Sequence, residues 1–235
     1  MPAFGPTSGP IWFDGMFDIA SQLALKWARH GKDSPITITD DFTRLTLDTI
    51  ALCAMDFRFN SFYKDNLHPF IKAMSNFLVE TGNRASRLPL PSIFYRKKDR
   101  TFFSDIEILR KTAGEVLQAR KSEGDLDTRK DLLSCMLNGV DPKTGKRMSD
   151  QSIMDNLITF LIAGHETTSG LLSFALYYLI ANPKAYMKAQ AEVDSICGQG
   201  PIKFEHLSKL SCVPAVSDHE IRVTVGNEAN GTVRS

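Results

Sequence analysis

Cysteine is scarce in this chain, and its four copies lie far apart. Cys53, Cys135, Cys197 and Cys212 are the only cysteines among 235 residues, and no two of them form a C-x-x-C pair. A structural zinc site needs closely spaced thiolates, and a small secreted domain needs a denser disulfide framework. The cysteine pattern therefore argues against both classes. It favours a reducing compartment, and we expect a cytoplasmic protein.

A surplus of charge of either sign is also missing. The chain has 28 Lys and Arg residues against 27 Asp and Glu residues. A nucleic acid or an anionic membrane surface would call for a basic surplus, so we expect neither as a partner. Residues 1–6 lack the basic and apolar regions of a signal peptide, and polar residues interrupt the longest apolar runs before they reach bilayer length. We therefore expect a soluble chain without a membrane span.

No internal repeat and no low-complexity tract marks a linker. With 43% hydrophobic and 23% charged residues, the composition is that of an ordinary globular protein. We expect one helical domain over residues 1–216. Residues 217–235 are rich in glycine, asparagine and threonine without a sustained period, which predicts a divergent, disordered tail.

Apolar residues recur at helical spacing through most of the chain. Together with capping residues and Gly or Pro stops, this spacing predicts helices over residues 11–30, 39–54, 68–80, 100–121, 131–138, 183–197 and 204–207. Arg44 and Asp48 are four residues apart, and we interpret them as a weak surface salt bridge. The basic, proline-rich segment 81–99 is predicted to be a mobile loop with solvated charges. Residues 141–145 read D-P-K-T-G, a turn sequence able to join two very short strands.

The stretch from Ser149 to Asn182 organises the chain. A polar cluster, A-G-H-E-T-T-S-G at residues 163–170, lies there between two apolar half-segments. Ser149 is a suitable N-cap, and Asn182 followed by Pro183 is a suitable stop. These features predict a helix of roughly 32 residues, about 48 Å long. So long and apolar a helix must cross the centre of a domain, so we expect an all-α fold with helices packed around it.

The polar cluster is the natural place for chemistry on this helix. Gly164 weakens the helical backbone, and the hydroxyls from Thr167 to Ser169 can bond back to earlier carbonyls, so we expect a bend or groove. Burying His165 and Glu166 requires partners or ordered water. The residue types leave two interpretations open, a satisfied polar patch or a chemical site. A zinc-hydrolase motif H-E-x-x-H is excluded because its last position holds Ser169, and we assign no metal ligand.

The cluster and the L-L-S-F-A-L that follows it resemble the central helix of the cytochrome P450 haem-thiolate monooxygenases. The resemblance is closest to the fatty-acid hydroxylases whose haem domain is fused to a flavin reductase. T-R-L-T-L-D-T-I at 43–50, F-R-F-N-S-F-Y at 57–63 and M-L-N-G at 136–139 resemble the same family. The resemblance covers most of residues 1–216.

The resemblance implies a fold, cofactors and partners. It implies the central part of the cytochrome P450 fold, with haem as the cofactor. The reaction it implies inserts one oxygen atom into a C–H bond of a fatty acid or similar lipophilic molecule. Electrons would come from NADPH through the FAD and FMN of a reductase, either fused or separate.

The same resemblance implies roles for residues of the central helix. Ala163 and Gly164 would lie against the distal face of the haem and leave room for dioxygen. Thr167 would hydrogen-bond the bound oxygen, and Glu166 would belong to the path of proton delivery. These two residues are the expected catalytic pair, since a hydroxyl beside a carboxylate can hold a chain of water in a dry cavity.

The resemblance also implies contacts with haem and substrate. Phe160 would lie near the haem edge, and Leu161 near both the haem and the substrate. Met74 and Leu78 fall where the fatty-acid hydroxylases line their substrate channel. From spacing alone, Met74 and Leu78 are equally typical of a helix core.

Two motifs of the family are missing from the 235 residues. The cysteine loop, with F-x-x-G-x-R-x-C-x-G spacing, occurs nowhere. An E-x-x-R pair should follow residues 213–216, but residues 217–222 read S-D-H-E-I-R, with the acid one position late. We expect a truncated sequence that is inactive as written. The alternative is a non-catalytic helical remnant that binds no haem.

Overall fold

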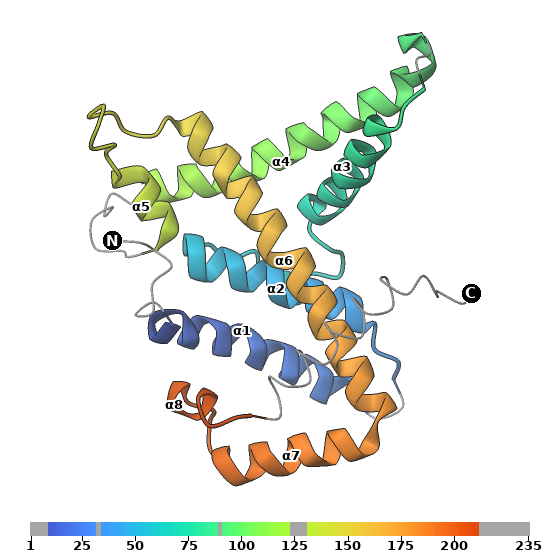
Figure 1. Ribbon diagram of the computed structural model, residues 1–235, viewed down its shortest axis with the longest axis vertical. Helices are drawn as coiled ribbons and strands as arrows, with labels where there is room; N and C mark the ends of the chain where they lie inside the picture. Colours follow the sequence, from blue (N-terminus) through green and yellow to red (C-terminus); the bar gives the residue numbers. More distant parts are fainter. Residues whose placement is uncertain (1–8, 32–33, 89–90, 123–130, 212–235) are drawn as a thin grey trace. The chain divides into compact units, whose positions relative to one another are not determined.

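The computed structural model describes residues 9–31, 34–88, 91–122 and 131–211, and helices dominate these ranges (Figure 1). The α-helices are α1 (Gly9–His30), α2 (Ile38–Met55), α3 (Pro69–Ala85), α4 (Arg96–Ser122), α5 (Leu132–Asn138), α6 (Asp150–Ala181), α7 (Pro183–Cys197) and α8 (Phe204–Leu207). Two short 3₁₀ helices are η1 (Ser61–Tyr63) and η2 (Ser92–Tyr95). In the described ranges, β pairing is limited to one antiparallel bridge between Val140 and Arg147, around the predicted turn. The predicted all-α class is confirmed.

The central helix α6 has the predicted length and ends. It runs unbroken for 32 residues through the polar cluster. Ser149 caps it, since the Ser149 hydroxyl accepts the backbone N–H of Ser152 at 3.2 Å. Pro183 then begins α7 one residue after Asn182, at a position where a helix tolerates the missing N–H. None of the described helices combines the length and the sustained hydropathy that crossing a bilayer requires.

Contacts among the described residues divide the chain into two units. The first unit is formed by residues 47–165, and the second by residues 9–46 together with 166–211. The boundaries fall inside α2 and α6. The prediction of one domain over 1–216 stays a prediction, and the predicted tail 217–235 lies outside the described residues.

The first unit has a well-defined apolar core. Its members come from the second half of α2, from α3, α4 and α5, and from the first half of α6. The most deeply buried are Leu47, Ala51, Ala54, Met55, Phe70, Ala73, Met74, Ala113, Val116, Leu117, Leu133, Ile153, Leu157 and Leu161. The helix α6 thus carries one wall of this core.

Both ends of segment 81–99 are helical. The helix α3 continues to Ala85, and α4 already begins at Arg96. Asp99 lies 2.6 Å from Arg84 and 2.8 Å from Arg87, and the Arg84 guanidinium stacks 3.8 Å from the ring centroid of Phe102. Hydrogen bonding from Arg87 holds the pKa of Asp99 below its usual value. The prediction of a loop is therefore wrong for residues 81–85 and 96–99, and the prediction of solvated charges is wrong for Arg84 and Arg87, because neighbouring carboxylates and aromatic rings pair these arginines. The other basic residues of the segment, Arg96, Lys97 and Lys98, are exposed.

The interpretation of Arg44 and Asp48 as a surface salt bridge is also wrong. Arg44 is 6% exposed and Asp48 is 2% exposed. The Asp48 carboxylate accepts hydrogen bonds from the backbone N–H of Ser61 at 2.8 Å and from its hydroxyl at 2.6 Å. Asp48 therefore anchors the segment after α2, a role that its spacing from Arg44 could not indicate.

Candidate cofactor and catalytic site

The helix α6 carries two different faces. Ile153, Leu157, Leu161 and His165, each four residues after the last, are all at most 1% exposed. Ala163 and Thr167, also four residues apart, are exposed, and Phe160 is half-buried. Residues at i, i+3 and i+7 share one side of a helix, so Phe160, Ala163 and Thr167 form a stripe along α6. This stripe is the candidate cofactor face.

The residues of the stripe fit one side of a haem. Ala163 offers only a methyl group, and Thr167, one turn on, offers a methyl group and a hydroxyl. Phe160 adds an aromatic surface on the preceding turn. Because Ala163 and Thr167 are exposed, a flat apolar group could contact this face. The described residues contain no cluster of three His, Cys, Asp or Glu side chains able to hold a bare metal ion.

Gly164 has a different neighbour from the stripe. A Cβ atom built on Gly164 would lie 2.8 Å from Cγ1 and 3.0 Å from Cδ1 of Ile50 on α2. Carbon atoms in contact are normally 3.5 to 4.0 Å apart, so only glycine fits at this distance. The predicted contact of Gly164 with the cofactor stays a prediction, while its contact with α2 is a feature of the first unit.

Most of the polar side chains in the cluster at residues 163–170 are exposed, so the cost of desolvating them is smaller than the sequence suggested. His165 is 1% exposed, whereas Glu166, Thr167 and Thr168 are exposed. His165 Nδ1 lies 3.0 Å from the carbonyl oxygen of Leu161, and since a carbonyl only accepts, Nδ1 carries the proton of this bond. The exposed carboxylate of Glu166 and the hydroxyl of Thr167 are adjacent in sequence, as the predicted catalytic pair requires.

The three residues predicted to contact substrate differ in burial. Met74 and Leu161 are 0% exposed and belong to the core of the first unit. Leu78 lies one turn after Met74 on α3 and keeps 36% of its surface exposed. Their role toward a substrate stays a prediction, and for Met74 and Leu161 the visible role is core packing.

Three of the four cysteines lie among the described residues. Cys53, Cys135 and Cys197 form no disulfide among the described residues, and each is partly buried. Burial raises the pKa of Cys53 to about 11, so its thiol stays protonated at neutral pH and is a poor iron ligand. Cys212 lies outside the described residues.

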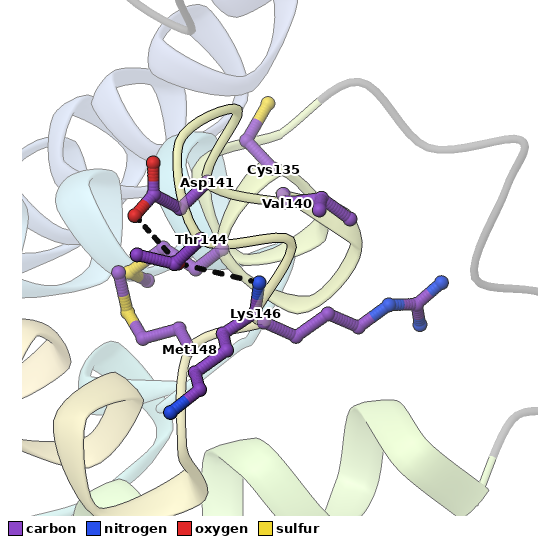
Figure 2. Close-up of a pocket in the computed structure, with 9 residues that line it drawn as sticks. Cys135, Val140, Asp141, Thr144, Lys146 and Met148 are labelled. Atoms are coloured by element: carbon purple, nitrogen blue, oxygen red, sulfur yellow. Dashed lines mark hydrogen bonds between the residues drawn. The ribbon is translucent and has the colours of Figure 1, made fainter.

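A pocket of about 490 Å³ lies beside the turn after α5, and sequence reasoning did not identify it (Figure 2). Its lining includes Cys135, Val140, Asp141, Lys146 and Met148. The Asp141 carboxylate accepts the hydroxyl of Thr144 at 2.7 Å and the backbone N–H of Lys143 at 2.9 Å, and these bonds lower the pKa of Asp141. The carboxylate thus closes the D-P-K-T-G turn, which was the only sequence feature that pointed to this place.

Comparison with known proteins agrees with the helical architecture. The cytochrome P450 family matches residues 8–220. A bifunctional cytochrome P450/NADPH–P450 reductase of Fusarium oxysporum is 55% identical over 224 residues, which is 95% of this chain and 21% of the relative. A protein of the same description from Aspergillus oryzae is 52% identical, over 95% of this chain and 20% of the relative. A self-sufficient cytochrome P450 monooxygenase of Exserohilum turcicum is 53% identical, over 95% of this chain and 21% of the relative.

The chain spans about a fifth of the length of these curated relatives. The family match nevertheless covers the great majority of its residues. This chain belongs to the cytochrome P450 family.

Proposed function

We propose that this chain is the central part of the haem domain of a monooxygenase that hydroxylates fatty acids or similar lipophilic molecules. Electrons would come from NADPH through a reductase containing FAD and FMN, fused or separate. The observation that carries the proposal is the accessible stripe of α6, where Ala163 and Thr167 flank one helical turn that also holds Glu166. The names of the relatives, which join a cytochrome P450 to an NADPH–P450 reductase, support the electron source.

Haem with a cysteine thiolate would supply the activation of dioxygen, because the thiolate pushes electron density that favours O–O cleavage. The chain's own residues would then control room and protons. The side chain of Ala163 is only a methyl group, so that a small molecule can lie between the helix and the cofactor. The Thr167 hydroxyl has one donor and two acceptor positions, enough to hold a water molecule and present its proton. The exposed Glu166 carboxylate can take protons from solvent and pass them to that water.

A lipophilic substrate would need accessible apolar surface on this chain. Phe160 and Leu78 keep accessible apolar surface, which suits an alkyl chain. No charged group has been assigned to a carboxylate end. A fatty acid therefore remains a proposal that rests on the family resemblance.

A chimera tests the proposed roles directly. Residues 8–220 would replace the matching segment of the Fusarium oxysporum relative, which carries the remainder of the protein. In this chimera we expect Thr167→Ala to lower the ratio of product formed to NADPH consumed by roughly tenfold, less than the roughly 10²- to 10⁴-fold effect of a direct acid–base group, because Thr167 would only hold the water that carries the proton. Hydrogen peroxide should rise correspondingly, because oxygen reduction would continue without orderly proton delivery.

Thr168→Ala is the matched control. Thr168 is also exposed, but lies about 100° further around the helix, away from the stripe. The ratio of product formed to NADPH consumed by the Thr168→Ala chimera should stay near that of the unmodified chimera. Equal effects of the two substitutions would remove Thr167 from its proposed role. A chimera that binds haem but oxidises no lipophilic molecule would refute the proposed function.

We further propose that a polypeptide of these 235 residues does not itself catalyse the reaction. None of its four cysteines lies in the F-x-x-G-x-R-x-C-x-G spacing, so no thiolate can be assigned to the iron. Purified polypeptide mixed with haem, reduced and exposed to carbon monoxide should therefore lack the thiolate-type carbonyl band. A strong thiolate-type band would show that one of these cysteines reaches the iron, and the proposal of an inactive polypeptide would be wrong.

A further inference from the structure

Gly164 lies where the central helix α6 approaches α2 very closely. A Cβ added to Gly164 would lie 2.8, 3.0 and 3.3 Å from Cγ1, Cδ1 and Cβ of Ile50. Among the described glycines, only Gly139 has a similarly short distance. A Cβ added to Gly139 would lie 2.7 Å from the carbonyl oxygen of Cys135, four residues earlier in the chain. Between two separate helices, the pair of Ile50 and Gly164 is the tightest. Both residues belong to the first unit.

Ile50 cannot easily give way. A β-branched side chain in a helix has one strongly preferred χ1 rotamer, so Cγ1 of Ile50 is held in place by its own backbone. Fully buried neighbours surround the pair on both helices, including Leu47 and Ala51 on α2 and Leu161 and His165 on α6. Space taken by a new methyl group would have to come from movement of a whole helix.

Glycine in the middle of a helix also needs a reason. It is intrinsically less stable there than alanine because its backbone loses more freedom. A close approach of a second helix is such a reason, and it is visible at Gly164. The glycine therefore serves the packing of α2 against α6, whatever else lies near it.

We propose that Ile50 is a positioning residue, whose side chain occupies the space left by Gly164 and thereby fixes the turn of α6 that presents Ala163. Ala163 precedes Gly164 directly, and Glu166 and Thr167 complete the same turn. Because half-buried Ile50 contacts α6 at Gly164 and exposed Ala163 is the preceding residue, a shift of the helix relative to Ile50 would also move the candidate cofactor face. The functional part of this inference rests on the proposed function, while the packing part does not.

Two explanations of Gly164 make opposite predictions. If the cofactor requires the glycine, a methyl group there is harmful only when haem is bound, and Ile50 is irrelevant. If Ile50 requires it, the methyl group is harmful without haem, and shortening Ile50 relieves the harm. The second outcome is the one the geometry supports.

The test uses the 235-residue chain without haem and measures the urea midpoint of the first unit. Gly164→Ala should lower this midpoint when Ile50 is present. In the Ile50→Ala background, which removes both Cγ1 and Cδ1, the same substitution should raise the midpoint, because alanine is the better helix former and space is available. Ile50→Val keeps a γ-carbon near the same position, so Gly164→Ala should still lower the midpoint there. The reversal of sign between the two backgrounds is the decisive result.

Gly114 on α4 supplies the matched control. A Cβ on Gly114 would meet only Met154 Sδ at 3.7 Å, an ordinary contact. Gly114→Ala should therefore raise the midpoint by a similar amount in both backgrounds. If Gly164→Ala alone fails to fold, recovery of folding by the added Ile50→Ala still supports the packing. Equal effects of Gly164→Ala with and without Ile50 would overturn it.

Hydrogen exchange tests positioning locally in the same haem-free chain. Ile50→Ala should speed exchange of the amides at residues 161–165 by roughly tenfold relative to the core amides of α4, because this turn of α6 loses its packing contact with the Ile50 side chain. Ile50→Val, which keeps the γ-carbon, should restore most of the protection. Uniform acceleration across α4 and α6 would reduce Ile50 to an ordinary core residue and overturn its positioning role.

The chimera then connects positioning to chemistry. At a temperature where every variant is folded and haem-loaded, Ile50→Ala should lower the ratio of product to NADPH severalfold, and Ile50→Val should restore it. An unchanged ratio with Ile50→Ala would overturn the functional part. A chimera that shows no monooxygenation at all would count against the proposed function, while the urea and exchange results would still decide the packing of Ile50 on Gly164.

Discussion

His68 shows how one side chain can join a helix end to a loop. It is the N-cap of α3, and its Nδ1 accepts the backbone N–H of Phe70 at 3.2 Å. Its ring packs on Phe59 with the centroids 4.8 Å apart. Burial lowers the pKa of His68, the charge of Lys64 lowers it further, and Glu115 acts in the opposite direction. A neutral ring suits the cap, because only an unprotonated Nδ1 can accept a hydrogen bond.

This lowered pKa predicts a pH dependence of stability. In the unfolded chain His68 binds a proton near its ordinary pKa of about 6.5, while in the folded chain it does so only at lower pH. The stabilisation is therefore present above pH 6.5 and is lost as the pH falls from there through the folded pKa. The slope can reach about 1.4 kcal/mol per pH unit for one proton. Urea midpoints between pH 5 and 8 would measure it.

His68→Asn is the control for this prediction. Asparagine keeps a capping oxygen but does not titrate, so the loss of stability between pH 6.5 and 5 should become shallower by up to one proton. The other histidines keep their own contributions. An unaltered slope in His68→Asn would show that the cap does not carry the pH dependence.

Local residue chemistry could be predicted where the partner is near in sequence. Ser149 as the cap of α6 and the turn at Asp141 both follow from neighbours within a few positions. The roles of Asp48 and Arg84 could not be predicted, because their partners lie 13 and 15 residues away on other segments. Their charges suggested solvent exposure, and the fold supplied partners instead.

At the scale of elements, the short helix α5 shows a limit of the same kind. A helix of seven residues is not stable alone, and its start at Asp131 was predictable from the capping pattern. What holds it is Arg120 of α4, which is 3% exposed and bonds both carboxylate oxygens of Asp131, at 3.0 and 2.7 Å. The same guanidinium donates to the carbonyl of Met55 at 2.7 Å, so it joins α4, α5 and the end of α2. Periodicity placed Arg120 in a helix but could not reveal this buried network.

The central helix was the most predictable element, and its neighbours were the least. Length, apolar flanks and caps were sufficient for the bounds of α6. The family resemblance named Phe160, Ala163 and Thr167, whose spacing on the helix places them on one side. These sequence features could not identify Ile50 as the neighbour of Gly164, since 114 positions separate the two residues. The sequence therefore predicted the residues of the candidate stripe but not the neighbouring contact of Gly164 with Ile50.

At the scale of the whole chain, the sequence predicted helices but not how contacts group them. Both units are discontinuous in sequence, and their boundaries lie within α2 and α6, where no linker composition could mark them. The family resemblance predicted the fold class, which is confirmed, and did so through motifs in α2, α5 and α6. Differences in burial between the two units are visible only in the structure.

The two units differ in the amount of apolar core. The contiguous core cluster lies entirely within residues 47–161. In the described part of the second unit, the buried hydrophobic side chains are Ile19, Leu23, Phe42 and Ala189. Large side chains there remain exposed, among them Phe174 at 60%, Tyr177 at 69%, Ile180 at 61% and Met187 at 60%. Since buried apolar area is the main source of stability, the two units should differ in their resistance to opening.

We therefore expect hydrogen exchange in the 235-residue chain to be uneven. Amides of α4 and of residues 153–161 in α6 should be the most protected, while those of α7 should exchange at least tenfold faster because few buried contacts hold that helix. Exchange measured by mass spectrometry at several urea concentrations would show the second unit opening at a lower concentration than the first. The control is Met187→Gln on α7, which removes exposed apolar surface and should leave protection in α4 unchanged. Equal protection of α4 and α7, lost together at one urea concentration, would mean that the chain unfolds as a single cooperative body, so that the division seen in its contacts has no thermodynamic counterpart.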